Sequence, residues 1–220
     1  MKKLLICAFL CCCLLFSGCK TEDPYLAYVS EARRDIFAGR SDNYDISAFL
    51  TEREYPYLND GIVGEKGVFL EFRVNTPLID GIKRSIVFSV GDDSLSADLT
   101  VNEVTGVYGA TAEVKGFAEK SFSVSVICGE KSETVILTSK VPENALSFKD
   151  ALKKLSEDNP ELLALYKTPE GVFDGEIRLK ILLKNEKPYW YAGLCDKKGK
   201  LKALLLDGIT GETLAVREIF

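Results

Sequence analysis

Six short segments between residues 67 and 140 constrain the fold most, because each alternates apolar and polar residues and ends at a turn signal. Alternation with a period of two is typical of strands that bury one face, and closely spaced turns favour an antiparallel arrangement. A further hairpin is expected over residues 29–49, which brings the total to about eight strands. This pattern predicts an antiparallel β-sandwich of immunoglobulin-like appearance. The six segments are 68–74, 85–90, 96–101, 108–114, 121–128 and 133–139.

The composition changes after residue 141, and helical spacing replaces the alternation. Ser147, followed three residues later by Asp150, is typical of a helix N-terminus, where the hydroxyl accepts a backbone N–H. Strand-like segments follow it, so we expect a small α+β domain in which one helix packs on an antiparallel sheet. These segments are 176–183, 188–194, 200–207 and 212–216.

The N-terminus has the layout of a secretory signal. Lys2 and Lys3 precede an apolar run from Leu4 to Phe16, and small residues follow it. Thirteen apolar residues extend only about 20 Å as a helix, whereas a bilayer core of about 30 Å needs nearer 20 of them. We therefore expect a cleaved signal peptide rather than a membrane span.

The segment Phe16-Ser17-Gly18-Cys19 resembles the lipobox of bacterial lipoproteins. That resemblance implies a diacylglyceryl group and acyl chains such as palmitate on Cys19, with cleavage just before it. It divides the N-terminus into a signal peptide (1–18) and a lipidated N-terminus with spacer (19–28), and it implies attachment to the extracytoplasmic face of a bacterial membrane. The alternative is an ordinary secretory signal that is cut near Ser17 and leaves Cys19 free.

The remaining cysteines do not indicate a metal site. Four of the seven lie inside the apolar run, which the signal peptidase removes, and a zinc site needs ligands on a framework that orients them. Cys128 and Cys195 could form a disulfide in an oxidising compartment. Two unpaired thiols are favoured, because the residues lie in different predicted domains, 29–141 and 142–220.

Charge and composition narrow the function. The full chain has 28 basic and 33 acidic residues and a net charge of −5. Removal of the signal peptide with Lys2 and Lys3 leaves 26 basic residues and a net charge of −7. An acidic chain argues against nucleic acid as a partner. The chain also contains no histidine, which is the commonest general base and metal ligand near neutral pH. We expect no catalytic residue, no metal and no cofactor apart from the lipid.

The C-terminal part resembles the PepSY domain of secreted peptidase propeptides and bacterial envelope proteins. The resemblance rests on residues 151–155 of the predicted helix, the aromatic strand 188–194 and the closing hairpin 206–214. It implies a noncatalytic interaction module that regulates an extracellular peptidase. It transfers no catalytic residue.

Two aromatic groups are candidate binding surfaces. In the strand Tyr189-Trp190-Tyr191, the tyrosines lie on one face and the tryptophan on the other. One face must pack on the helix, so the opposite face is a candidate surface for a protein or peptide partner.

The second group is Arg53, Tyr55 and Tyr57, where the rings could stack on a sugar or peptide and Arg53 could bind a carboxylate. The alternative is that these tyrosines only cover an edge of the sandwich. A calcium site at Asp196, Asp207 and Glu212 is disfavoured, because lysines adjoin Asp196 and the acidic residues are typical of turns.

These observations predict a lipid-anchored extracytoplasmic protein that binds a protein or peptide without catalysis. The alternative is a surface lipoprotein that binds carbohydrate or cell wall through Tyr55 and Tyr57. A hydrolase that uses carboxylates is a third hypothesis.

Overall fold

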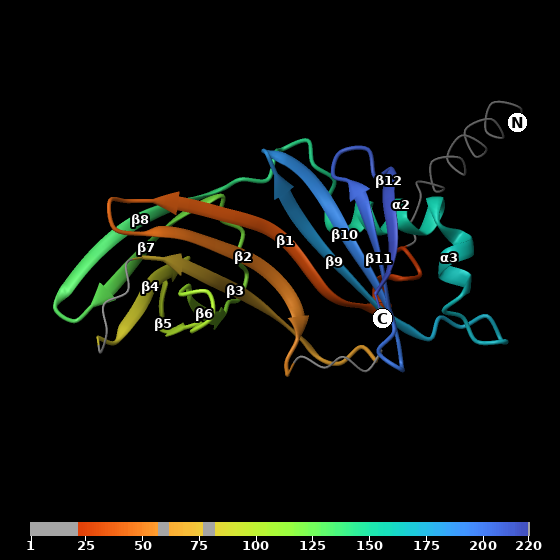
Figure 1. The fold of residues 1–220 in the computed structure, drawn as a ribbon, viewed down its shortest axis with the longest axis horizontal. Helices are drawn as coiled ribbons and strands as arrows, with labels where there is room; N and C mark the ends of the chain where they lie inside the picture. Colours follow the sequence, from red (N-terminus) through yellow and green to blue (C-terminus); the bar gives the residue numbers. More distant parts are fainter. Residues whose placement is uncertain (1–21, 57–61, 77–81, 220) are drawn as a thin grey trace, which may run out of the picture.

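The computed structural model describes residues 22–56, 62–76 and 82–219 of the 220-residue chain. Across these ranges, strands β1 to β12 belong to one continuous sheet (Figure 1). A 3-10 helix, η1 (Leu26–Tyr28), precedes the first strand, and helices α2 (Phe148–Asp158) and α3 (Pro160–Ala164) lie between β8 and β9. The strands are β1 (Val29–Arg40), β2 (Asp45–Glu54), β3 (Lys66–Asn75), β4 (Arg84–Val90), β5 (Asp93–Val101), β6 (Tyr108–Glu113), β7 (Ser121–Cys128), β8 (Lys131–Ser139), β9 (Gly175–Lys184), β10 (Lys187–Asp196), β11 (Leu201–Asp207) and β12 (Thr213–Ile219).

Strands β1 to β8 close into an antiparallel barrel. The order around the barrel is β1-β2-β3-β6-β5-β4-β7-β8, and β8 pairs again with β1. An eight-stranded barrel is just wide enough for side chains to fill its interior. Here the interior contains a cluster of phenylalanine rings, including Phe37, Phe72, Phe88 and Phe122, whose contacts are edge-on or tilted. This cluster is the first of two hydrophobic cores.

The predicted β-sandwich is wrong, although the predicted strands are confirmed. Strand β7, for example, spans Ser121–Cys128 as the alternation predicts. Alternation shows which residues share a face, but it does not show which strand lies beside which. A closed barrel and two packed sheets therefore produce the same pattern, and the pairing of Phe37 with Ser139, far apart in sequence, decides between them.

Gly39 lets β1 pass very close to β8 where the barrel closes. A Cβ atom at this position would lie 2.1 Å from the carbonyl oxygen of Ile136 and 2.9 Å from Cδ2 of Leu137. Glycine in a strand often marks a close approach of another backbone, because any side chain would collide with it. The barrel thus closes at a position where a side chain does not fit.

Strand β1 also joins the barrel to the remaining strands. Its residues from Val29 to Arg33 pair in parallel with β9, whereas Phe37 and Ala38 pair with β8. Val29 and Ala32 accordingly pack in a second core outside the barrel. Strands β9 to β12 therefore continue the barrel wall, and the predicted separate sheet of an α+β domain is wrong in this respect.

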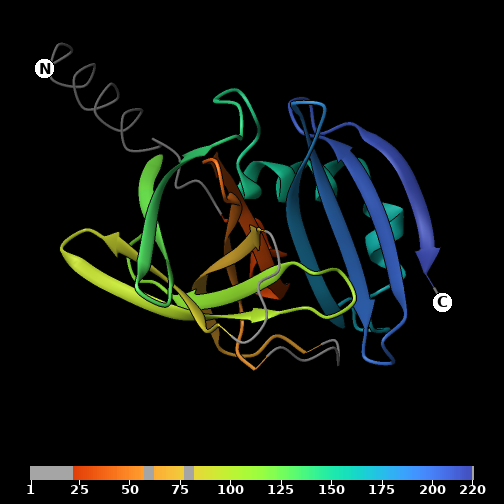
Figure 2. The same ribbon diagram turned by 60° about the vertical axis from the view of Figure 1, so that its left-hand side comes forward.

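Helices α2 and α3 lie on one face of the outer strands (Figure 2). The predicted start of α2 is confirmed, because the Ser147 hydroxyl accepts the backbone N–H of Asp150 at 3.2 Å. Leu152 and Leu155 of α2 are fully buried against the sheet. Burial of each such side chain contributes about 1.5–3 kcal/mol of hydrophobic stabilisation, which fixes the helix on this face.

The expected division at residue 141 falls in the connection between β8 and α2. This connection contacts both parts of the molecule. The backbone N–H of Lys140 donates to the carbonyl oxygen of Ile36 at 2.8 Å, and that of Leu146 donates to Gly208 at 2.8 Å. The indole N–H of Trp190 donates to the Leu146 carbonyl at 3.2 Å. The connection is therefore held against the barrel strand β1 and against the outer sheet.

Candidate functional site

The face of the sheet opposite the helices has a row of charged side chains across adjacent strands. Ala32 and Leu179 point into the core under the helices, so their sequence neighbours Glu31 and Arg178 point to the other side. Glu31 lies opposite Arg53 on one neighbouring strand and opposite Arg178 on the other. We call this set, Glu31, Arg53, Glu71, Glu176, Arg178 and Lys180, the charged face.

Opposite charges on the charged face are paired. Lys180 Nζ lies 2.7 Å from Glu31 Oε2, and Arg53 Nε donates to Glu71 Oε1 at 2.8 Å. Arg178 pairs with Glu176, whose side chain is 0% exposed. A charge removed from water in this way is costly unless its partner stays in place. Loss of one partner is therefore expected to destabilise this part of the sheet, where Lys180 of β9 pairs with Glu31 of β1.

The thiol and phenol groups beside these pairs stay protonated. Burial and the neighbouring Glu176 raise the pKa of the Cys195 thiol. Burial likewise raises the pKa of Tyr191, although nearby Arg178 opposes that shift. Neither group is therefore prepared as a nucleophile near neutral pH. Cys128 and Cys195 are not joined by a disulfide, which agrees with the favoured interpretation.

An open pocket lies next to the charged face, at the junction of the barrel and the outer sheet. Its volume is about 710 Å³. The lining is mainly aliphatic and aromatic, with three cationic side chains and, among the described residues, no carboxylate. We call it the Arg33 pocket, and its lining residues are Arg33, Ile36, Ser47, Phe49, Arg73, Leu182, Leu183, Lys184, Tyr189 and Leu205.

The Phe49 ring holds two guanidinium groups in this pocket. The Cζ atom of Arg33 lies 4.4 Å from the ring centroid and that of Arg73 lies 5.1 Å from it. Such cation–π contacts orient the planar guanidinium without occupying its N–H donors. The pocket can therefore present oriented donors to an anion.

The electrostatics of Arg33 are unusual for an arginine near the surface. Burial lowers the pKa of Arg33, while Glu31 and Glu71 oppose that shift and Arg73 adds to it. No ion pair to Arg33 occurs within the described part of the chain, and its buried Nε has no hydrogen-bond partner there. The next residue, Arg34, pairs with Glu52 at 3.4 Å. Arg33 is thus a half-buried cation that a bound anion would stabilise.

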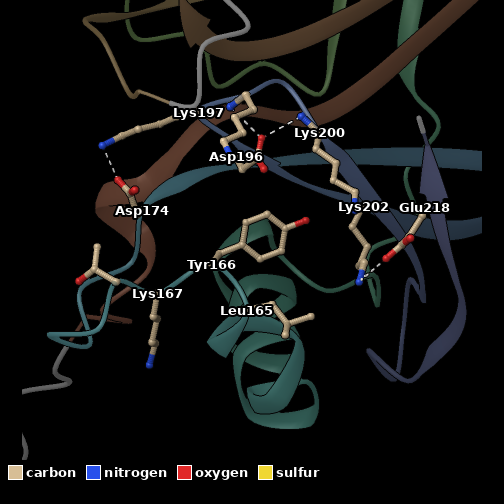
Figure 3. Close-up of a pocket in the computed structure, with 11 residues that line it drawn as sticks. Leu165, Tyr166, Lys167, Asp174, Asp196, Lys197, Lys200, Lys202 and Glu218 are labelled. Atoms are coloured by element: carbon tan, nitrogen blue, oxygen red, sulfur yellow. Dashed lines mark hydrogen bonds and ion pairs between the residues drawn. The ribbon is translucent and has the colours of Figure 1, made fainter.

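A second pocket of about 410 Å³ surrounds Tyr166 (Figure 3). Lysines outnumber carboxylates in its lining by five to three, but all three carboxylates are engaged. Asp174 pairs with Lys197, and Glu218 pairs with Lys202 at 2.8 Å. Asp196 accepts backbone N–H groups of its own turn. Two of the lysines are thereby paired, and the lining as a whole keeps an excess of positive charge at the surface.

The tyrosine at the centre of this second pocket is not a general base. Burial, followed by Asp196, Cys195 and Glu218, raises the pKa of Tyr166 to about 12. Its hydroxyl donates to the Leu194 carbonyl at 3.2 Å. Protonated and already bonded, Tyr166 supports the hairpin after β10 rather than a reaction.

The predicted aromatic strand divides as its alternation requires. Trp190 is only 1% exposed and packs in the core under the helices, opposite Ile181 and Leu206 on the neighbouring strands. Tyr189 and Tyr191 are half-buried on the opposite face. Tyr189 lines the Arg33 pocket, so the structure leaves the tyrosine face as the accessible one.

The second predicted group is only partly brought together. Arg53 forms an ion pair with Glu71, and its Cζ atom lies 4.6 Å from the centroid of the Phe69 ring. Its charge is therefore already paired within the protein. Tyr55 is 72% exposed, and its ring lies 5.7 Å from that of Phe69. Tyr57 and the predicted lipidation site Cys19 lie outside the described residues.

The acidic residues of the C-terminal turns cap those turns. Asp207 Oδ1 accepts the backbone N–H groups of Thr210 and Ile209 at 2.8 and 2.9 Å, and these bonds lower the pKa of Asp207. Asp196 caps the preceding turn in the same way. The residues that the structure describes contain no group of three or more His, Cys, Asp or Glu side chains placed to hold a metal ion.

Sequence reasoning missed Arg33, Phe49 and Arg73. Each is an ordinary strand residue, and they come together only because Phe49 lies on β2 between strands that carry the two arginines. A partial signal was present, because β1 contains the pair Arg33-Arg34 in a strand that must be half-buried. A charge in such a strand needs a partner or a ligand.

No protein-family model matches this chain, and no curated protein matches it. None of the helices in the described ranges is long and apolar enough to cross a bilayer.

Proposed function

We propose that this chain is a lipid-anchored protein of the extracytoplasmic side of a bacterial membrane, and that it binds another protein or peptide without catalysing a reaction. The lipobox-like segment at Cys19 supports the anchor, and the absence of histidine from the sequence supports a noncatalytic role. The resemblance of the C-terminal part to PepSY supports a secreted peptidase as the partner class.

The observation that carries the binding role is the edge of strand β12. Every other strand in the described sheet has a neighbour on both sides, whereas β12 pairs only with β11. The strand is not protected by burial, because Leu214 and Val216 are 48% and 53% exposed. Edge strands with apolar residues and open backbone groups recruit strands from partners. We infer that an extended segment of the partner adds to β12.

A photo-crosslinking residue at Val216 tests this interaction in the intact cell envelope. We expect one dominant adduct of defined mass, because added strands place their side chains within a few ångströms of the edge. Val104, which is 95% exposed in the turn after β5, is the matched control and should give no such adduct. Equal labelling from both positions, or none from Val216, contradicts the proposal. Mass spectrometry of the adduct then shows whether the partner is a peptidase.

Replacement of Cys19 by serine tests the anchor. Serine has no thiol to receive the lipid, so we expect the variant to lose incorporated fatty acid and to leave the membrane fraction. Lipid chains supply the binding energy, at about 0.8 kcal/mol for each buried methylene, and stable attachment needs more than one chain. Cys13→Ser, within the apolar run, should keep both properties. A Cys19→Ser protein that still labels with palmitate and sediments with membranes would falsify the anchor.

A further inference from the structure

We propose that the Arg33 pocket binds the C-terminal residue of a peptide, with Arg33 holding the terminal carboxylate and the apolar wall holding the last side chain. This inference rests on the proposed function and names the chemistry that a second surface of the same protein recognises. It concerns the junction of β1, β2, β9 and β10, which is separate from the edge of β12.

The charges that line the pocket favour an anionic ligand. Arg33, Arg73 and Lys184 line the pocket, and no carboxylate of the described residues does. The nearest acidic residues on the charged face are already engaged, since Glu71 accepts from Arg53 and Glu31 accepts from Lys180. Burial deprives a half-buried guanidinium without an ion pair of part of its hydration. A bound anion stabilises it, because charge-assisted hydrogen bonds replace the lost interactions with water.

The position of Arg33 favours a carboxylate as the anionic group. The Arg33 guanidinium lies over the Phe49 ring, with its Cζ atom 4.4 Å from the ring centroid, and this contact restricts the positions that the guanidinium can take. A guanidinium held in one orientation presents parallel N–H donors, which match the two oxygens of a carboxylate. The ordering cost of binding is therefore reduced before the ligand arrives.

The walls and the size of the pocket favour a ligand with an apolar body. Leu182, Leu205 and the Tyr189 ring provide an apolar surface on the outer-sheet side. The volume of about 710 Å³ is within the range of roughly 300–1,000 Å³ that is usual for small-ligand sites. A ligand that pairs with the cationic side chains and also packs against the apolar walls carries one anionic group on an apolar body.

A peptide C-terminus fits this description better than a polyanion. The charged face next to the pocket contains Glu31, Glu71 and Glu176, and the chain carries a net charge of −5. Extended polyanions such as nucleic acids would be repelled outside the pocket. A single carboxylate contacts only the cationic part. An apolar C-terminal residue supplies the remaining contact area.

The test measures fluorescence anisotropy with the full-length protein in lipid nanodiscs. The probe is a fluorescein-labelled pentapeptide that ends in two leucines, either with a free C-terminal carboxylate or as the C-terminal amide. We expect the amide to bind at least 10-fold more weakly, which is the loss usual for a charge-assisted hydrogen bond. Equal binding of acid and amide, or no binding of the acid up to millimolar concentration, overturns the proposal.

Matched variants assign the effect to Arg33. We expect Arg33→Met to weaken binding of the acid by about 10- to 100-fold and to abolish the preference over the amide. Arg34→Met, whose side chain pairs with Glu52 instead, should stay within twofold of the original protein. Lys184→Met lies at the exposed rim and should weaken binding about threefold, so a folding defect in Arg33→Met leaves the proposal testable. Equal effects of Arg33→Met and Arg34→Met overturn it.

Octanoate distinguishes a peptide from a free fatty acid. We expect octanoate to compete only weakly, because it lacks the peptide backbone. Displacement of the peptide by octanoate at equal or lower concentration overturns the choice of a peptide. The outcome is independent of the β12 experiment. If the Val216 adduct persists while the acid preference is absent, only this inference fails.

Discussion

Replacement of Gly39 by alanine is expected to lower the free energy of unfolding by about 3 kcal/mol. The added Cβ would lie 2.1 Å from the carbonyl oxygen of Ile136, and no real Cβ approaches a backbone oxygen so closely. A flexible side chain could move away, but the atom contacted belongs to the backbone of β8. The strand must therefore shift, and the pairs of Phe37 and Ala38 with β8 that close the barrel weaken. Urea denaturation of both proteins measures the difference.

Gly109→Ala is the matched control. Gly109 also lies in a barrel strand, β6, but its Cβ would meet the Phe72 carbonyl oxygen at an ordinary 3.7 Å. Replacing a glycine by alanine without a clash usually stabilises the folded protein by about 0.4–1 kcal/mol, because the unfolded chain loses conformational entropy. Equal stabilities of the Gly39→Ala and Gly109→Ala proteins would show that β1 and β8 do not approach as described.

Arg178→Met on the charged face is expected to cost about 3–5 kcal/mol. The substitution keeps the aliphatic bulk but leaves Glu176, which is 0% exposed, without its charged partner. The energy that is lost is mainly the cost of an uncompensated buried charge. Chemical denaturation at neutral pH measures it.

Two further variants separate this effect from a simple loss of contacts. Removing both charges with Glu176→Met and Arg178→Met should recover most of the stability, because a buried pair replaced by apolar residues is often neutral. Lys153→Met breaks an exposed pair with Glu157, whose atoms lie 3.7 Å apart, and should change stability by less than about 1 kcal/mol. A double variant as unstable as Arg178→Met alone contradicts the assignment.

The local structure could largely be predicted from the sequence, because it depends on nearby residues. The hydroxyl of Ser147 does cap α2, and β7 covers the predicted Ser121–Cys128. The arrangement of strands could not be predicted in this way. Alternation assigns Phe37 to a buried face, but it contains no information that Ser139 is its partner across the barrel.

The candidate site shows the same limit. The sequence placed Trp190 and its flanking tyrosines on opposite faces, and the choice between the faces depended on the helix. The strand register decides which face packs on the helices. Trp190 lies opposite Leu206, which is fully buried under α2 and α3. Arg33 and Phe49 form a site only through the pairing of β1 with β2, which shifts by one residue just after Arg33. No local pattern encodes that shift.

Strand β1 has a thermodynamic consequence for the whole molecule. Val29 and Ala32 of this strand belong to one hydrophobic core, and Phe37 belongs to the other. Unfolding of β1 therefore disrupts both cores together. Loss of the barrel removes the inner neighbour of β9, and loss of the outer sheet exposes the first half of β1. Barrel and outer sheet are therefore coupled into a single cooperative unit, in which a disturbance at either end is transmitted through one polypeptide segment.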